Sequence, residues 1–408
     1  MKILQINSSD YANGGGGTIA MYRLYTGLKQ AGFDCKILSG IKTIDSPDSS
    51  KINRSQRLEK ALKKITENVG LYDIHCVSSY NLKKNKFYQS ADILNFHVIH
   101  SGYFNYLAIP SLTKNKPAVF TLHDMWSFTG HCAYTYDCDR WKIGCGKCPY
   151  PDSYPAVARD NTHLEWKLKN WVYSHSNLTI VTLSNWLDEQ VKQSMLKSLP
   201  IYHIPNGIDT QAYQPLDSEQ CRFVLGVPPN KKVLMFGAES LKDSRKGGDL
   251  LVKALSSLPE SLKAETILLT LGHGGKSISE TVGMANLNLG YVSSDRLKSI
   301  AFSAADLFVF PTRADNLPLI LQESLACGTP IVSFKIGGVP DLVRPGITGY
   351  LASPENANDF CNGIVQLLED QNLRNSMSQN CRAIAVKEYP LEGQTQKYID
   401  LYNKILTK

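Results

Sequence analysis

The stretch LFVFPTRADNLPLILQESLACGTPIVSFKIGGVPD, residues 307–341, decides how the chain is interpreted. A short apolar run is followed by a polar loop with a proline, an apolar pattern of helical spacing, a second apolar run and a Gly-Gly turn. A strand, a helix and a second strand in this order form one unit of a parallel sheet. Ligands of such sheets bind outside the carboxyl ends of the strands. The polar loop at 311–318 is therefore the expected place of a binding site.

The helix that follows this loop has the features of an anion site. Pro318 suits the first helical turn, where its missing N–H costs nothing, and Gly328 suits the helix end. The start of the helix offers free N–H groups and the positive end of the helix dipole to a diphosphate. Asp315 and Glu323 lie eight positions apart, and a helix carboxylate can accept hydrogen bonds from two vicinal hydroxyls, as on ribose. The alternative is a helix cap, a surface acid and a turn.

Beyond this stretch, the 408 residues suit two domains. Apolar runs alternate with helical patterns in both halves, and turn residues interrupt them at 204–209, which favours two parallel sheets covered on both faces. We expect an α/β protein with two doubly wound domains that face each other across a cleft. The first covers 1–205 and includes a returning helix at 391–408, and the second covers 206–390. The expected strands are 2–7, 34–38, 93–97, 118–122, 179–183, 233–236, 267–271, 288–290, 307–310 and 331–334, and the principal helices are 18–31, 249–257, 295–304, 317–326, 356–368 and 391–407.

The positive charge lies entirely in the first half. Residues 1–210 hold 24 Lys and Arg against 17 Asp and Glu, and the remainder holds 20 of each, for a net charge of +7. The densest basic segment, 51–66, carries Leu58, Leu62 and Ile65 at helical spacing. This helix either rests on an anionic membrane surface or is a core helix with a solvated basic face. The chain has 43% hydrophobic residues, no apolar run of membrane length and no signal peptide. We therefore expect a cytoplasmic protein without nucleic-acid partners. Peripheral contact at the inner membrane is one interpretation of the basic helix.

Two basic residues follow another predicted strand. Arg245 and Lys246 lie in the loop after 233–236, where a forked guanidinium and a point-charge ammonium can together neutralise a diphosphate. The alternative is a solvated basic loop. His123 ends the strand at 118–122 and either contacts a ligand or caps a turn. The run Gly14–Gly17 after the first strand lacks the spacing of a dinucleotide-binding motif.

The Asp315–Glu323 spacing resembles the carboxylate-x7-carboxylate motif of the retaining family 4 glycosyltransferases, which have the GT-B fold. Those enzymes usually carry Glu at the first position, where this chain has Asp315. The resemblance implies that Glu323 holds the donor ribose and Asp315 contacts the donor sugar. It places a nucleotide-sugar site at Asn316, Leu317 and Pro318.

Other motifs extend this resemblance. Lys246-Gly247 matches the family's Lys-Gly pair, His123 matches a histidine presented to the donor sugar, and Gly15 and Gly16 match the first loop. Together with Asp315, the resemblance assigns His123, Arg245 and Lys246 to catalysis. GT-B enzymes need no metal for the reaction, so no cofactor is expected for catalysis.

Four of the ten cysteines fall within 17 residues: Cys132, Cys138, Cys145 and Cys148. The segment resembles a subgroup of family 4 enzymes from polysaccharide gene clusters. Four thiolates can bind a structural zinc ion, with His131 or His123 as further ligands. Reduced thiols packed in a loop, or a redox-labile pair, are the alternatives.

The expected function is transfer of a sugar, of the hexosyltransferase type and with retained anomeric configuration, from a nucleotide-diphosphate sugar to a hydroxyl of a glycan or lipid-linked acceptor. Surface polysaccharide biosynthesis is the expected context. A non-catalytic sugar-nucleotide-binding partner with the same fold is the main alternative, because Asp replaces Glu at 315 and Ala238 stands where the family has Arg. A nucleotide-sugar epimerase shares the fold and is a third interpretation, which the carboxylate spacing disfavours.

Overall fold

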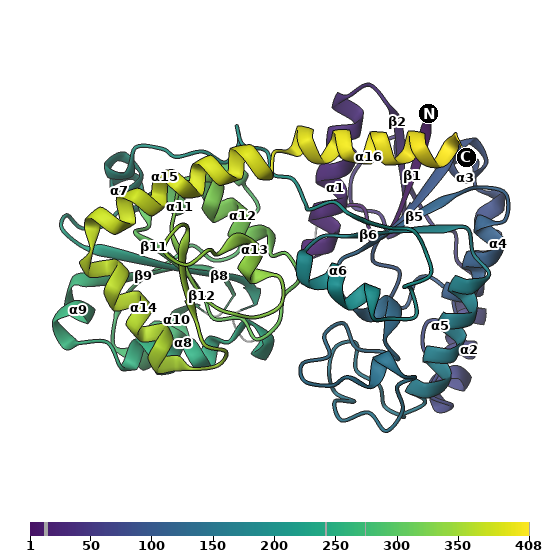
Figure 1. Ribbon diagram of the computed structural model, residues 1–408, viewed down its shortest axis with the longest axis horizontal. Coiled ribbons are helices and arrows are strands. Elements are labelled where there is room, and N and C mark those ends of the chain that lie inside the picture. Colours follow the sequence, from purple (N-terminus) through teal and green to yellow (C-terminus); the bar gives the residue numbers. More distant parts are fainter. Residues whose placement is uncertain (12–14, 241–242, 274, 408) are drawn as a thin grey trace. The chain divides into compact units, whose positions relative to one another are not determined.

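The computed structural model describes residues 1–11, 15–240, 243–273 and 275–407. It divides the chain into two compact units, one formed by Met1–Gly207 with Glu392–Lys408 and the other by Ile208–Leu391 (Figure 1). Each unit contains one parallel sheet with helices. The expected α/β class with two parallel sheets is thus confirmed.

The first unit is built on a seven-stranded sheet in the order β3-β2-β1-β4-β5-β6-β7, and every pairing is parallel. The central strands β4, β5 and β6 are buried along their whole length, as expected for a parallel sheet covered on both faces. The strands are β1 Lys2–Ser9, β2 Asp34–Ile41, β3 Ser49–Lys51, β4 Ile93–Phe96, β5 Ala118–Leu122, β6 Leu178–Thr182 and β7 Ile201–His203. The α-helices are α1 Gly15–Gln30, α2 Gln56–Asn68, α3 Lys86–Ser90, α4 Ile109–Thr113, α5 Thr162–Ser174, α6 Asn185–Lys192 and α16 Leu391–Leu406, and the 3-10 helices are η1 Val77–Lys84, η2 Tyr106–Ala108, η3 Trp126–Phe128 and η4 Arg140–Lys142.

The C-terminal helix α16 returns to the first unit, as the yellow ribbon beside the purple and blue strands shows in Figure 1. Its tyrosines Tyr398 and Tyr402 are fully buried. The Tyr402 hydroxyl accepts a 2.9 Å hydrogen bond from Asn95 on β4, and the Tyr398 hydroxyl lies 2.9 Å from Thr121 Oγ1 on β5. The helix therefore completes the core of this unit.

The second unit is built on a six-stranded parallel sheet in the order β10-β9-β8-β11-β12-β13. The strands β8 and β11 are parallel neighbours although they are far apart in sequence. Because they are parallel, the loops that follow them meet at the same edge of the sheet. The strands are β8 Lys232–Ser240, β9 Thr266–His273, β10 Ala285–Asn288, β11 Leu307–Phe310, β12 Ile331–Phe334 and β13 Gly349–Ala352. The helices are α7 Ser218–Leu225, η5 Ser244–Lys246, α8 Gly248–Ser256, α9 Glu260–Glu265, α10 Gly275–Val282, α11 Asp295–Ala304, α12 Leu319–Ala326, α13 Val339–Leu342, α14 Ala357–Glu369 and α15 Gln371–Glu388.

Two kinds of difference from the expected elements concern short or glycine-rich segments. The strands β3, β7 and β13 have three or four residues each and were not expected. Helix α1 begins at Gly15 and not near 18, so part of the expected glycine loop is helical. Glycine is a poor helix former, so propensity did not place a helix start there. Within the described residues, no helix is long and apolar enough to cross a membrane.

Candidate active site

A cluster of charged side chains forms where β8 and β11 end. The Lys246 ammonium lies 2.8 Å from Asp315 Oδ2, and Arg245 Nη1 lies 3.1 Å from Asp315 Oδ1. Thr312 Oγ1 donates a 2.9 Å hydrogen bond to Asp315 Oδ2. The structure therefore brings together three of the residues that the sequence assigned to catalysis. The contacts with the acidic side chain fix the positions of both cations.

The electrostatics keep Asp315 ionised although its side chain is almost inaccessible, at 8% exposure. Burial alone would raise the pKa of Asp315, but the charges of Lys246 and Arg245 and the hydrogen bonds from Lys246 and Thr312 outweigh burial and lower it. Burial lowers the pKa of Lys246, and the charge of Asp315 opposes this effect. Asp243 Oδ2 also lies 3.5 Å from Arg245 Nη2, so the two cations and two carboxylates form one compact ion cluster.

Two glycines allow these loops to approach closely. Gly247 has φ +69°, and a Cβ there would lie 1.9 Å from the Pro311 carbonyl oxygen. Gly337 has φ +51°, and its Cβ would lie 2.1 Å from the Asp315 carbonyl oxygen. Neither position accepts a side chain without movement of the backbone that carries Asp315. These glycines thus set the position of the carboxylate.

Helix α12 carries the second acid of the motif. Pro318 has φ −64° and ψ 121° and is the N-cap, so its expected place in the first helical turn is wrong, and the helix begins at Leu319. Leu321 N donates a 3.1 Å bond to the Pro318 carbonyl, which makes the proline the last residue outside the helix. Glu323 is 4% exposed, and its Oε2 lies 3.9 Å from Lys298 Nζ on α11. Asn316 and Leu317 are buried in the loop just before the helix, together with Pro318.

In the first unit, His123 follows β5 and forms a hydrogen-bonded chain with His97, which follows β4. His123 Nε2 lies 2.9 Å from His97 Nδ1, and His97 Nε2 lies 2.7 Å from Gln5 Oε1 on β1. Because the Gln5 oxygen only accepts, His97 Nε2 carries a proton and its Nδ1 accepts from His123 Nε2–H. Burial lowers the pKa of His123 to about 4 and that of His97 well below its ordinary value, so both rings are neutral near pH 7.

The glycine run lies against His123. A Cβ on Gly17 would lie 2.8 Å from Val98 Cγ2 and 3.2 Å from His123 Cγ. Gly15 has φ +66°, and neither Gly15 nor Gly16 would place a Cβ within 4 Å of another group. Gly14 lies outside the described residues. The first turn of α1 thus starts beside the histidine that follows β5.

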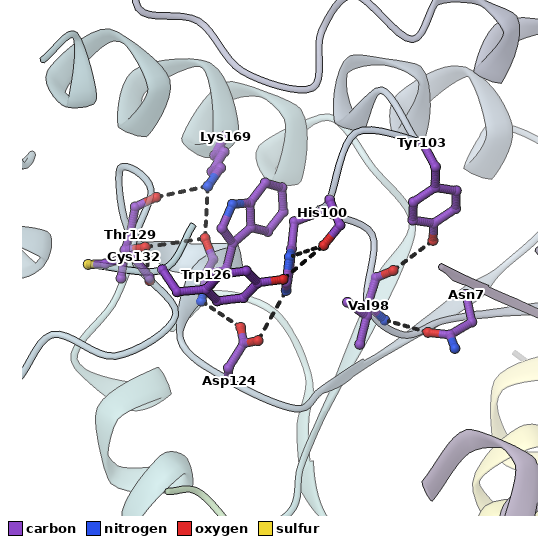
Figure 2. A network of polar contacts seen from close by, with 11 residues as sticks. Asn7, Val98, His100, Tyr103, Asp124, Trp126, Thr129, Cys132 and Lys169 are labelled. Atoms are coloured by element: carbon purple, nitrogen blue, oxygen red, sulfur yellow. Dashed lines mark hydrogen bonds and ion pairs between the residues drawn. The ribbon is translucent and has the colours of Figure 1, made fainter. Parts of the chain in front are cut away.

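Two polar residues near His123 were missed in the sequence. His100 and Asp124 follow β4 and β5, and His100 Nε2 lies 3.1 Å from Asp124 Oδ2. Figure 2 shows this pair beside Trp126, with Asn7 contacting the Val98 backbone nearby. Burial would raise the pKa of Asp124, but His100 and the Trp126 amide lower it. Their position after neighbouring strands, which they share with His123, was the available signal.

The four clustered cysteines lie in the segment between β5 and α5. All ten cysteines are free, and no group of three or more His, Cys, Asp or Glu in the described parts of the chain is placed to hold a metal ion. Instead, Cys145 Sγ accepts from Gly130 N at 3.2 Å, and Cys148 Sγ lies 3.2 Å from His131 Nε2. The zinc interpretation stays a prediction that metal analysis of the purified protein would test.

Two family models match the chain. The model of glycosyltransferase family 4 matches residues 14–212, and that of the group 1 glycosyl transferases matches residues 217–384. Together they span most of both units. The chain belongs to the group 1 and family 4 glycosyltransferases.

Among named relatives, the putative colanic acid biosynthesis glycosyl transferase WcaC of Escherichia coli K12 is 31% identical over 252 residues, which cover 59% of each chain. A D-inositol 3-phosphate glycosyltransferase of Actinosynnema mirum is 30% identical over 43% of this chain and 45% of its own length. The chain thus spans about half the length of these curated relatives.

Solved structures confirm the GT-B fold. Sucrose-phosphate synthase from Thermosynechococcus elongatus has a TM-score of 0.72 at 17% identity, with 100% of both chains covered. This likeness concerns the fold alone. It agrees with the two parallel sheets described above.

Proposed function

We propose that the protein is a retaining glycosyltransferase of the hexosyltransferase type. It transfers a sugar from a nucleotide-diphosphate sugar to a hydroxyl of a glycan or lipid-linked acceptor, in surface polysaccharide biosynthesis. The contact of Arg245 and Lys246 with buried Asp315 carries the proposal, because it holds two cations in fixed positions where they can stabilise a leaving diphosphate. The colanic acid name of a relative supports the polysaccharide context. A structural neighbour of 17% identity and TM-score 0.68, Alr3699/HepE of Anabaena, is a complex with UDP and glucose.

The residues take the following roles in this reaction. Cleavage of the bond between the anomeric carbon and the diphosphate oxygen leaves negative charge on the diphosphate, which Arg245, Lys246 and the N–H groups at the start of α12 stabilise. The acceptor oxygen forms the new bond on the same face, and its proton passes to the departing diphosphate. No side chain then needs to act as nucleophile. Asp315 and neutral His123 position sugar hydroxyls, and Glu323 holds the ribose.

Helix α2 supports a peripheral contact with a membrane. Its apolar residues Leu58 and Ile65 are 53% and 63% exposed, while the acid Glu59 faces inward and is 2% exposed. Glu59 accepts from the Ser78 amide at 2.9 Å and from Arg54 Nε at 2.7 Å, which fixes the helix in this orientation. An exposed apolar stripe among basic residues matches the chemistry of an anionic lipid surface and argues against a core helix.

Nucleotide binding tests the proposal at its base. Purified wild-type protein is expected to unfold at higher temperature with the nucleotide sugar that it uses, because a ligand stabilises the state it binds. Glu323→Ala should abolish this shift, since the ribose hydroxyls lose their acceptor. Glu369→Ala, an exposed acid on α14, is the matched control and should keep the shift. A shift that persists in Glu323→Ala refutes the ribose role. A nucleotide that binds without turnover with any acceptor supports the non-catalytic alternative.

Membrane contact is tested by co-sedimentation with vesicles of phosphatidylcholine and phosphatidylglycerol. The double variant Leu58→Ser, Ile65→Ser should lose most of the bound fraction, because about 25 cal/mol is lost for each Å² of apolar surface that no longer inserts. Phe223→Ser, which changes a residue of 86% exposure on α7 in the second unit, is the control. Equal sedimentation of both variants would refute the contact.

A further inference from the structure

A second candidate site lies in the first unit, in a cavity of about 190 Å³. Its walls come from the end of α2, the segment that follows it, the loops after β4 and β5, the cysteine-containing segment and α5. Drug-sized ligands usually occupy about 300–1,000 Å³. The cavity therefore has room for a ligand much smaller than a nucleotide sugar, on the scale of one sugar ring.

Two buried charged residues of α5 hold these walls in place. Lys169 Nζ donates to the carbonyls of Trp126 at 2.8 Å and Thr129 at 3.1 Å, and Figure 2 shows the ammonium between these two loop positions. Glu165 accepts from the Tyr72 amide at 2.5 Å and from the Tyr106 hydroxyl. Apolar residues would fill a purely structural core at lower cost than a buried ammonium and carboxyl. The cavity is thus a built feature with rigid polar walls.

Polar groups also face the cavity. Nδ1 of His75 is buried and, within the described residues, has no hydrogen-bond partner, and the side chain is 4% exposed. Burial lowers the pKa of His75, so the ring is neutral near pH 7 and offers one donor or one acceptor. Asp73 beside it accepts from Gly102 N at 2.6 Å. A buried polar atom without a partner is unfavourable, and because His75 lines the cavity, a ligand hydroxyl that bonds to Nδ1 would remove that cost.

The charge and polarity of the lining narrow the ligand class. The lining holds the acids Glu67, Asp73 and Glu165 and the ammonium groups of Lys63 and Lys169. Burial raises the pKa of Glu165 to about 7 and raises that of Asp73, so the net charge of the lining is small and favours an uncharged ligand over phosphate and sugar acids. Pro155, Ala156 and Val157 supply an apolar wall. Hydroxyl-binding groups opposite an apolar surface suit a pyranose ring, which has both kinds of face.

We propose that this cavity binds one uncharged pyranose unit of the acceptor, a unit that does not itself react. This inference rests on the proposed glycosyltransferase function. Helix α2 connects the cavity with the proposed membrane contact, because Lys63 and Glu67 line the cavity while Leu58 and Ile65 of the same helix are exposed. A lipid-linked acceptor thus places its lipid at the stripe of α2 and a neutral sugar beneath the cysteine segment.

The test measures binding of methyl α-glycosides of glucose, galactose and mannose, and of N-acetylglucosamine, to the full chain without nucleotide. Saturation-transfer NMR with titration should give a millimolar Kd for at least one of them. Ala156→Trp at the exposed rim should weaken that binding at least tenfold. Ala158→Trp, an exposed position in the same segment that does not line the cavity, should leave it unchanged. Asp73→Asn keeps the size of a residue at φ +62° and should weaken binding severalfold.

The inference is overturned if no neutral glycoside binds, if Ala156→Trp binds as well as wild type, or if glucuronate or inorganic phosphate is the ligand that Ala156→Trp excludes. The nucleotide shift on the same samples separates this inference from the proposed function. Glycoside binding without a nucleotide-induced shift in unfolding temperature refutes the proposed transferase function and supports the sugar site in the cavity. A nucleotide-induced shift without glycoside binding supports the proposed function and refutes the sugar site.

Discussion

The loops at the carboxyl ends of the strands carry charged side chains in one sheet and neutral side chains in the other. At the carboxyl ends of β8 and β11, Arg245 and Lys246 surround an ionised Asp315. At the carboxyl ends of β4 and β5, His97 and His123 are held neutral by burial. A diphosphate needs fixed positive charge, whereas sugar hydroxyls need neutral donors and acceptors. One architecture therefore supplies either chemistry, and the side chains of the loops decide which.

The strongest challenge to this contrast is removal of the positive charge. Lys246→Ala should lower turnover of the nucleotide sugar by about 10²–10³-fold, the usual cost of losing one preorganised stabilising group. Turnover is measured as nucleotide release. Lys253→Ala, an exposed lysine on α8, should behave as wild type. Lys246→Ala with wild-type turnover would show that the cluster only supports the fold.

The neutral histidines of the first sheet predict that the stability of the protein depends on pH. His123 has a native pKa of about 4, below its ordinary value of 6.5, so the unfolded chain takes up a proton more readily. Stability is therefore full above about pH 6.5 and falls as the pH drops to 4, by about 3 kcal/mol at 1.36 kcal/mol per pKa unit. Denaturant unfolding of wild type and His123→Gln between pH 7 and 4 measures the difference.

His123→Gln keeps an N–H donor for His97 without a titrating ring, so its stability should depend less on pH. The control His175→Gln changes an exposed histidine and should keep the wild-type slope. Equal slopes for wild type and His123→Gln would contradict the neutral pair.

The smallest expected effect concerns the backbone at two glycines of the second unit. Gly247 and Gly226 have nearly the same φ, +69° and +70°, but only Gly247 would place a Cβ against another group, the Pro311 carbonyl. Gly226→Ala should cost about 1–2 kcal/mol for the left-handed conformation alone. Gly247→Ala should cost about 1–3 kcal/mol more and weaken nucleotide binding, because the Pro311 loop must move. Thermal unfolding compares them, and equal losses would show that this loop is not tightly held.

The sequence predicts some strands to the residue. β5, β11 and β12 match their expected bounds, because continuous apolar runs end at turn residues. The contact between Lys246 and Asp315 was beyond the sequence, since it depends on β8 lying beside β11 with β9 and β10 on its other side. Only packing decides that order.

Periodicity also left the direction of helix faces open. The apolar stripe of α2 was visible in the sequence, but its exposure follows from Glu59 binding Ser78 and Arg54 inside. Nothing in the sequence sets Lys169 and Glu165 apart from exposed charges, yet both are buried and line the cavity. A residue pattern gives the spacing of side chains, and the neighbouring segments decide which side is covered.

The return of α16 to the first unit bears on how the chain is made. Translation delivers β4 and β5 early, whereas Tyr398 and Tyr402, which fill the core beside them, emerge some 280 residues later. Domains often fold in the order in which they leave the ribosome. Here the second unit, complete by Leu391, can close while the first still lacks its last helix. The growing chain must therefore hold an incompletely covered N-terminal sheet until α16 has been made, and in that interval the exposed apolar surface is open to chaperones and proteases.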